Sequence, residues 1–208
     1  MQPVTEAPQR RERKKRQTRY ALVQAALELF NAQGYEHTAV REITDAVDVS
    51  ERTFFRYFAG KEDLLLSFIG ELTDAFLREL VGRPPAEPPF TALTNAFRVS
   101  LLERTAEDGE SPYLMVIKMI DFTPQLLAAM VRYTHGRDDE IVRALAAREG
   151  VDAGTDRRPR LAVIAYNAVT MAATTEWRSS GDDSVEALLA AFDAYAAQLG
   201  PAISGRWT

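Results

Sequence analysis

Residues 38–61, which read TAVREITDAVDVSERTFFRYFAGK, constrain the fold more than any other part of the chain. Val40, Ile43 and Val47 recur at the spacing of one face of a helix. The pattern then breaks at Asp48 and Val49, and Ser50 opens a second helix. Two short helices joined by a tight turn predict a helix-turn-helix.

The second of these helices has two chemically different sides. Phe54 and Phe58 share one side, and the helical rotation of about 100° per residue places Arg52, Thr53 and Arg56 opposite them. Arginine donates a bidentate fork to guanine, and threonine can bond a base or contact a thymine methyl group. The pattern favours a helix that enters a DNA major groove, although a merely solvated amphipathic helix has the same division.

Three short motifs follow one another here: Val-Ser at 49–50, Thr-Phe-Phe-Arg-Tyr-Phe at 53–58 and Lys-Glu-Asp-Leu at 61–64. By these motifs and their order, roughly residues 15–66 resemble the DNA-binding domain of the TetR family of bacterial repressors. The rest of the chain matches that family only in length, helical content and helix order. The resemblance implies a dimeric repressor that leaves a palindromic operator in double-stranded DNA when a small effector binds.

The resemblance also implies which residues contact DNA. On the family pattern, Arg41, Arg52 and Thr53 read bases. The full predicted set lies on both helices and at the start of the next one: Thr38, Arg41, Ser50, Arg52, Thr53, Phe55, Arg56, Tyr57 and Lys61. Thr38 is in addition expected to cap the first helix of the motif, with its hydroxyl accepting from the amide of Arg41.

Phosphate contacts are implied for Phe55, Tyr57 and Lys61. Phe55 departs from the family, which usually has tyrosine there, and phenylalanine has no hydroxyl to donate to a phosphate oxygen. Gly60 likewise replaces the usual serine-like residue before Lys61. The acidic Glu62 and a tolerated glycine cap still predict a helix that starts near Lys61.

Composition limits the remaining possibilities. The 208 residues contain no cysteine and two histidines, so disulfides and thiolate metal sites are excluded and a zinc site is disfavoured. The basic first thirty residues do not read as a secretory signal. The longest uncharged apolar stretch, 161–175, has 15 residues, against about 20 for a membrane span. A cytoplasmic protein with no cofactor and no membrane partner is expected.

The net charge of −5 is unevenly divided. Residues 1–60 hold 10 Lys and Arg against 8 Asp and Glu, whereas 61–208 hold 15 against 22, so the net charges are +2 and −7. The positive charge is concentrated at 10–19, a run suited to phosphates. It is equally compatible with a solvated tail, so DNA contact by this arm stays an open alternative.

The helical patterns divide the chain into four parts: a basic flexible arm at 1–14, a helix-turn-helix domain at 15–60, a connector helix at 61–82, and a ligand-binding and dimerisation domain at 83–208. The first helix is expected at 15–33, ended by Gly34. Proline at the first helical turn marks two later starts, at Pro112 and Pro124.

The remaining helices are expected at 90–106, 124–150, 158–180 and 184–199, the last stopping at Gly200 and Pro201. No strand-like alternation is present. The prediction is therefore an all-α fold of about nine helices, in which a three-helix N-terminal domain precedes a C-terminal bundle.

In the resembling family the last two helices form a dimer with a second copy. The residues expected to supply that surface here are Leu161, Ile164, Ala165, Ala168, Ala172, Leu188, Ala191, Phe192 and Tyr195. The alternative is that they only complete the core of the monomer.

Effector residues carry no shared motif, so they are chosen as the aromatic, methionine and polar residues of the C-terminal helices. They are Phe76, Phe97, Leu101, Met115, Met119, Phe122, Met130, Tyr133, Tyr166, Asn167, Thr170, Thr174 and Trp177. Such an interior suits a hydrophobic ligand. Residues 113–180 also look like TetR relatives with an acyl-CoA-like-binding domain, and Arg98, Lys118, Arg132 and Asn167 are the candidates to meet an anionic head group.

Two other classes of function compete with this reading. An all-helical enzyme is disfavoured because no paired-histidine metal motif, cysteine nucleophile or Gly-rich phosphate loop occurs, and His37 and His135 lie in ordinary contexts. An architectural DNA-binding protein would need basic charge over the whole molecule, which the acidic C-terminal part lacks.

Overall fold

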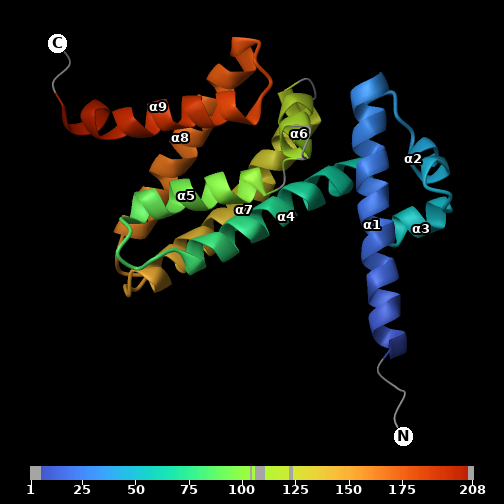
Figure 1. The fold of residues 1–208 in the computed structure, drawn as a ribbon, viewed down its shortest axis with the longest axis horizontal. Helices are drawn as coiled ribbons and strands as arrows, with labels where there is room; N and C mark the ends of the chain where they lie inside the picture. The colour runs from blue at the N-terminus through green and yellow to red at the C-terminus, as the bar shows by residue number, and fades with distance from the viewer. Residues whose placement is uncertain (1–5, 104, 106–110, 122–123, 206–208) are drawn as a thin grey trace, which may run out of the picture. The chain divides into compact units, whose positions relative to one another are not determined.

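The computed structural model describes residues 6–103, 105, 111–121 and 124–205, and its regular structure there is entirely helical (Figure 1). The chain divides into two compact units, residues 1–68 and 69–208, with the boundary inside the fourth helix. The described part contains nine helices, as predicted: α1 (Glu6–Gln33), α2 (Val40–Ala46), α3 (Glu51–Phe55), α4 (Lys61–Gly82), α5 (Pro89–Leu102), α6 (Pro112–Asp121), α7 (Pro124–Arg148), α8 (Arg158–Ser180) and α9 (Val185–Ser204).

The N-terminal unit is a small core built on α1. Leu22 and Phe30 of α1 are buried together with Ile43 of α2 and Phe54 of α3. The first helix ends where predicted, because Gly34 adopts a φ of +90°, a left-handed conformation that glycine reaches without strain. α2 packs on α1 and α3 on α2, so the two short helices are held by the long one.

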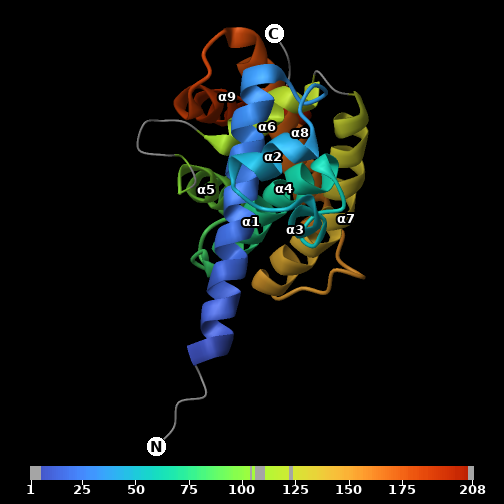
Figure 2. The same ribbon diagram turned by 90° about the vertical axis from the view of Figure 1, so that its right-hand side faces the viewer.

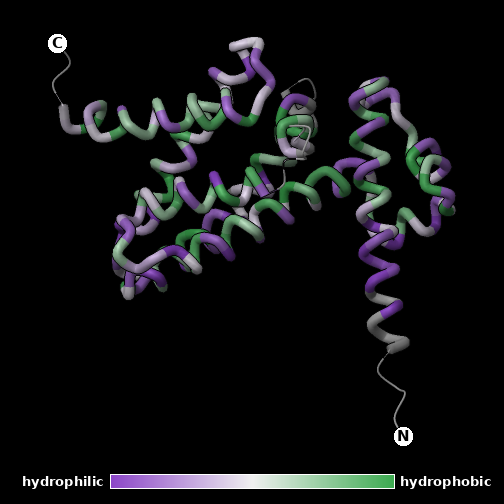
Figure 3. Tube along the Cα trace, viewed as in Figure 1, coloured by the Kyte–Doolittle hydropathy of each residue, from purple (hydrophilic) through white to green (hydrophobic). Residues whose placement is uncertain are grey.

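α1 begins earlier than the sequence predicted. It starts at Glu6, so residues 6–14, expected to be a flexible arm, are helical. Most residues in this stretch are Glu, Gln, Arg and Lys, which are good helix formers, and Pro8 falls in the first turn, where proline is tolerated. The cationic run at 10–19 is therefore carried on a helix, and the coloured turns near the N-terminal end of α1 are hydrophilic in Figure 3.

The C-terminal unit is a bundle in which α8 contacts α5, α7 and α9 (Figure 2). Its interior is aromatic: Phe76 stacks on Tyr166 at 5.4 Å between ring centroids, and Phe97 meets Phe192 at 5.2 Å. Helix ends follow local chemistry, as at Gly181, whose φ of +77° ends α8 where predicted. No helix within the described ranges has the length and apolar character to cross a membrane.

Two helices run past residues that are poor helix formers. α7 continues through Gly136, and α9 continues through Pro201 to Ser204. The predicted stop at Gly200 and Pro201 is therefore wrong. A proline removes one backbone hydrogen bond, but near a helix end the cost is small, and the amide of Gly205 still bonds the carbonyl of Pro201 at 2.8 Å.

An ion pair and several side-chain hydrogen bonds hold the proline-rich loop between α4 and α5. Arg83 donates to both carboxylate oxygens of Glu87 at 2.7 and 2.6 Å, and Asn95 donates to the same carboxylate at 2.6 Å. Arg148 of α7 bonds the carbonyls of Pro84 and Glu87 at 2.5 and 2.8 Å. Because proline offers no amide for regular structure, these side chains hold the loop instead.

The Glu87→Gln variant is expected to lower the free energy of unfolding at pH 7 by about 1 kcal/mol. The hydrogen bonds from Arg83, assisted by Asn95, hold the pKa of Glu87 at about 2, below its ordinary value of 4.5. A lowered pKa stabilises the fold above pH 4.5, and this contribution disappears as the pH falls towards 2. In urea unfolding, the difference in free energy of unfolding between the wild type and Glu87→Gln should be smaller at pH 3 than at pH 7. The control variant Glu103→Gln, at the exposed end of α5, should unfold like the wild type at both pH values. An undiminished deficit at pH 3 would contradict this.

Candidate nucleic-acid interface and interior pocket

The second helix of the motif is shorter than expected. α3 begins directly after Ser50, as predicted, and the Ser50 hydroxyl caps it by accepting from the amide of Thr53 at 3.3 Å. α3 ends at Phe55, so Phe58, which was expected on the same helix, lies in the following turn. It stays beside Phe54 all the same, because its amide bonds the carbonyl of Phe54 at 3.0 Å and their ring centroids are 5.5 Å apart.

The turn between α2 and α3 is tight because Asp48 adopts a φ of +52°. Aspartate is one of the few non-glycine residues that tolerate this left-handed conformation. The amide of Val49 then reaches back to the carbonyl of Thr44 at 3.0 Å and closes the end of α2. The break predicted at these residues is confirmed.

Two of the three expected base-reading side chains are exposed. Arg41 and Arg52 are exposed, and Arg41 pairs with Asp45 across one helical turn at 3.7 Å. An exposed i,i+4 pair of this length contributes little, so it leaves Arg41 available to another partner. Thr53 is half-buried, with its hydroxyl 3.1 Å from that of Ser50.

The residues expected at phosphates form an aromatic and cationic edge beside α3. Phe55 exposes 54% of its surface, an unusual amount for phenylalanine. The guanidinium of Arg56 lies 5.0 Å from the centre of the Tyr57 ring and donates to the Tyr57 hydroxyl at 3.3 Å. Tyr57 therefore positions Arg56 and retains a hydroxyl proton for another acceptor.

Thr38 does not have its predicted capping role. The cap of α2 is Ala39, whose amide donates to the Glu42 carboxylate at 2.7 Å. Thr38 is 1% exposed, and its hydroxyl donates to the carbonyl of Gly34 at 2.8 Å. Its side chain thus fastens the loop after α1. The predicted cap residue was therefore wrong by one position. The Glu42 side chain bonds the backbone amide of the cap residue, and this half of a capping box forms even though the cap residue is alanine.

Lys61, which was expected to contact a phosphate, is held by three contacts within the protein. Its ammonium group donates to the carbonyls of Tyr35 and Thr38 at 2.6 and 2.7 Å and lies 4.4 Å from the centre of the Tyr35 ring. Partial burial lowers its pKa. Because an ammonium group has three protons, one donor remains after the two carbonyl bonds. Lys61 thus braces the start of α4 against the loop 34–38.

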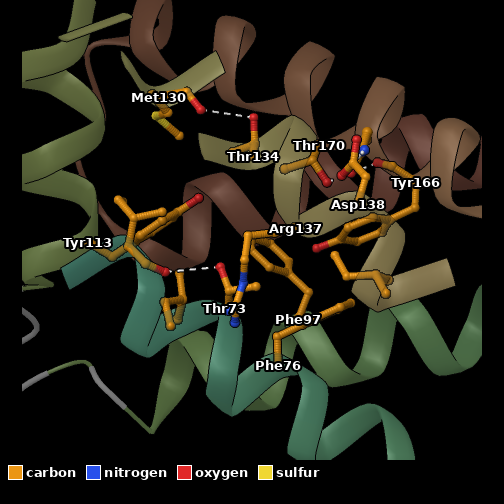
Figure 4. Close-up of a pocket in the computed structure, with 14 residues that line it drawn as sticks. Thr73, Phe76, Phe97, Tyr113, Met130, Thr134, Arg137, Asp138, Tyr166 and Thr170 are labelled. Atoms are coloured by element: carbon orange, nitrogen blue, oxygen red, sulfur yellow. Dashed lines mark hydrogen bonds between the residues drawn. The ribbon is translucent and has the colours of Figure 1, made fainter. Parts of the chain in front are cut away.

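The C-terminal unit contains a cavity of about 160 Å³ between α4, α5, α6, α7 and α8 (Figure 4). Six of its lining residues were named from the sequence: Phe76, Phe97, Met130, Tyr166, Asn167 and Thr170. Eight others were missed: Ile69, Leu72, Thr73, Tyr113, Thr134, Arg137, Asp138 and Ile141. Helical spacing could have found several of them, because Ile69, Leu72 and Thr73 lie on the same face of α4 as Phe76.

Several predicted effector residues lie elsewhere. Trp177 is 1% exposed, and its indole N–H donates to the carbonyl of Ser184 at 3.0 Å, which fixes the turn between α8 and α9. The hydroxyl of Tyr133 faces Gly70, where an added Cβ would lie 2.5 Å away. The others that do not line this cavity are Leu101, Met115 and Thr174, while the side chain of Met119 and all of Phe122 lie outside the described structure.

The cations expected to meet an anionic head group are engaged at the surface. Arg98 pairs with Asp193, and Lys118 pairs with Asp183. The amide of Asn167 instead donates to Asp138 at 3.0 Å, within the cavity lining. Arg132 is exposed and does not line the cavity. The basic group that does line it is Arg137, which the sequence did not single out.

The polar side chains that line the cavity include hydroxyl groups as well as charged groups. Burial raises the pKa of Tyr113 to about 12 and also raises the pKa of Tyr166. Both phenols are therefore neutral at physiological pH and can donate or accept hydrogen bonds. Thr134 donates to the carbonyl of Met130 at 3.0 Å, and Thr170 to that of Tyr166 at 2.9 Å, so each keeps lone pairs for a further donor.

The outer side of α8 exposes large apolar side chains. Leu161, Ile164 and Met171 are 63%, 56% and 70% exposed, and they recur on one helical face with Ala168. Tyr195 of α9 is 37% exposed. Ala165 and Ala172 are half-buried, whereas Leu188, Ala191 and Phe192, expected on a dimer surface, are buried in the monomer core because α9 turns them towards α8.

Comparison with known proteins assigns both units. Residues 22–68 match the family model of bacterial regulatory proteins of the tetR family, and residues 87–200 match the model of the MftR C-terminal domain. The HTH-type transcriptional regulator TcmR of Streptomyces glaucescens is 41% identical over 206 residues, which cover 96% of this chain and 90% of TcmR. The chain belongs to the TetR family.

Solved structures of other TetR-family members share the fold. The fatty acid degradation regulator FadR from Bacillus halodurans gives a TM-score of 0.60 at 18% identity, over 90% of this chain and 97% of that one. FadR from Thermus thermophilus, a TetR-family repressor in complex with lauroyl-CoA, gives 0.54 at 23% identity, over 91% and 97%. At these identities the likeness concerns the helical fold. The relatives are transcriptional regulators, which are not enzymes.

Proposed function

We propose that this protein is a homodimeric repressor that reads a palindromic DNA operator through α3 and releases it when a small, largely hydrophobic effector enters the cavity of the C-terminal unit. Membership of a family of DNA-binding regulators supports the first half of this proposal. The exposed arginines of α2 and α3 and the aromatic cavity support the two kinds of binding site.

The observation that carries the proposal is the continuity of α4. This single helix runs from Lys61 to Gly82. Its first turns bury Leu64 in the N-terminal unit, and its later turns place Leu72 and Phe76 in the lining of the cavity. Because both parts belong to one helix, a ligand that displaces its cavity-lining turns would also act on the turns that belong to the reading unit. Typical coupling of this kind is about 1–3 kcal/mol.

A direct ion pair joins α4 to the opposite wall of the cavity. Arg137 of α7 pairs with Asp74 of α4 and also lies 3.1 Å from Glu140. The close approach of Tyr133 to Gly70 adds a second point where α7 meets α4. A movement of α7 around a ligand would therefore be transmitted to α4 through these two contacts, because packed groups have few other arrangements.

A second copy of the chain is the proposed partner of α8 and α9. Exposed Leu161, Ile164 and Met171 form an apolar face that a monomer leaves in water. Two-fold symmetry would bury this face and would present two copies of α3 to successive major grooves, which multiplies the affinity for a palindrome.

The effector proposed here is small and hydrophobic. The lining is rich in aromatic and aliphatic side chains, and Met130 can adapt to irregular shapes. The lauroyl-CoA complex of the Thermus thermophilus FadR illustrates that this fold can house an acyl ligand. An acyl-type molecule therefore remains within the proposed class.

Replacing Arg52 with alanine is expected to weaken binding to a selected palindromic duplex by about 10- to 100-fold, because a base-reading arginine contributes about 1–3 kcal/mol. Binding to random duplex should change much less, so the sequence preference relaxes. Fluorescence anisotropy at fixed salt measures both affinities. Arg78→Ala, which removes an exposed arginine from the C-terminal part of α4, is the matched control. Equal losses on both duplexes would show that Arg52 contacts only the backbone.

A further inference from the structure

Arg137 brings an incompletely bonded donor group to the effector cavity. Figure 4 shows its side chain among the residues that line the cavity. One terminal nitrogen pairs with Asp74, and the other lies 3.1 Å from Glu140. The Nε atom is buried and has no acceptor among the described residues. Buried donors are nearly always bonded, so this N–H calls for an acceptor that the protein itself does not supply.

The charges around Arg137 select the kind of acceptor. Two carboxylates, those of Asp74 and Glu140, pair with the guanidinium, and a third acidic side chain, Asp138, lines the same cavity. Arg137 is the one basic side chain among the described lining residues. An anionic ligand group would approach an excess of negative charge and would have to be desolvated as well. An uncharged carbonyl, ether or hydroxyl oxygen avoids both costs.

The aromatic lining and the volume of the cavity indicate that the ligand has a compact aromatic ring. The Phe76 and Tyr166 rings are stacked, with 20° between their planes, and Phe97 meets Tyr166 edge-on at 6.2 Å. The volume of about 160 Å³ is close to that of a protein cavity known to hold benzene, and it is smaller than the roughly 300–1,000 Å³ of drug-sized sites. A ligand larger than one ring must therefore widen the cavity, and contact with the buried Nε requires such a rearrangement.

On the basis of the proposed function, we propose that Arg137 is a specificity-determining residue that donates from Nε to an uncharged oxygen acceptor on an aromatic effector. The amide of Asn167 lines the same cavity and keeps a second N–H that can donate to the same oxygen, whereas the hydroxyls of Thr134 and Thr170 can only accept, as from a ligand hydroxyl. The effector class is thus a neutral, oxygen-bearing aromatic compound. Fatty carboxylates and other ligands whose buried group is anionic are selected against.

Three probes of nearly the same size and shape test this directly: acetophenone, which carries a carbonyl oxygen; α-methylstyrene, in which a CH₂ group replaces that oxygen; and benzoate, which is anionic. Isothermal titration or ligand-observed NMR on the full-length protein gives their dissociation constants. Acetophenone is expected to bind at least about tenfold more tightly than either of the others, because a hydrogen bond to a charged donor is among the stronger kinds. Equal binding of α-methylstyrene, tighter binding of benzoate, or binding of none of the three would overturn the proposal.

Variants assign the preference to Nε. Arg137→Lys keeps the charge and removes the Nε donor, so the acetophenone preference should fall below about threefold. Asp74→Asn leaves Nε in place and should keep the preference, as should Arg143→Lys on the exposed side of α7. A preference that survives Arg137→Lys in a protein with a normal melting curve contradicts the assignment. Binding of the wild-type protein to selected operator DNA is measured separately, so loss of DNA recognition and loss of probe selectivity are distinguishable failures.

Discussion

Replacing Ile164 with aspartate is expected to convert the proposed dimer to a monomer and to lower the affinity for a palindromic operator by at least about 100-fold. Ile164 is 56% exposed near the middle of the apolar face of α8. In a two-fold interface the substitution is present on both sides, so two carboxylates would be desolvated together. Sedimentation velocity at micromolar concentration reports the oligomeric state, and anisotropy reports DNA binding.

The matched control is Val131→Asp on α7, which places the same charge on an apolar residue that is 48% exposed but lies outside α8 and α9. It should remain a dimer with unchanged DNA affinity. If the Ile164 variant sediments as the wild type does, the assembly uses another surface. If both proteins are monomers that still bind a palindrome tightly, the proposed role of symmetry is wrong.

Phe54→Ala is expected to destabilise the N-terminal unit by about 3–5 kcal/mol, a large share of the stability of a domain of this size. Phe54 is completely buried, and its ring contacts Phe55 at 5.4 Å and Phe58 at 5.5 Å between centroids. The small core cannot collapse around the missing ring, because α2 and α3 are too short to hold without it. DNA binding should be lost together with the unit's cooperative unfolding transition.

Phe55→Ala is the control for this change, since it removes the neighbouring phenylalanine, which is 54% exposed. Its cost in folding stability should be below about 0.5 kcal/mol. Urea unfolding followed by circular dichroism compares the two variants. Equal stability of the two would show that burial in the core of the reading unit is not what holds α3. The Phe55 variant also measures what an exposed ring contributes to DNA binding.

Helix ends were predictable wherever a single residue determines the local backbone conformation or caps the helix. Ser50, Pro112 and Pro124 mark helix starts, and Gly34 and Gly181 mark helix ends, as their hydrogen-bonding and torsional chemistry implies. Residues whose influence is weaker gave errors. Pro201 interrupts one bond close to a helix end and does not stop α9.

Side chains with two plausible partners could not be assigned from periodicity. Trp177 shares a helical stripe with Tyr166 and Thr170, which line the cavity, yet its indole N–H bonds the loop carbonyl of Ser184. Lys61 follows a family pattern for phosphate contact, but two carbonyls of the loop after α1 hold it. These outcomes depend on contacts between residues distant in the sequence.

Arg137 illustrates the same limit for the effector site. In the sequence it stands in Arg-Asp-Asp-Glu at 137–140, which reads as a solvated helix face. Its position in the cavity follows from the packing of α7 against α4 and from its pairing with Asp74, 63 residues earlier in the chain. Sequence patterns predicted an aromatic interior, but the charged group within it required the three-dimensional arrangement.

The most direct test of the central claim compares a palindrome selected from random DNA by this protein with a scrambled duplex of equal composition, at physiological salt. A sequence-reading dimer should bind the palindrome at least about 1,000-fold more tightly, with two protein chains per duplex. A ratio near one would contradict the account and would favour an architectural protein that binds DNA through its backbone alone.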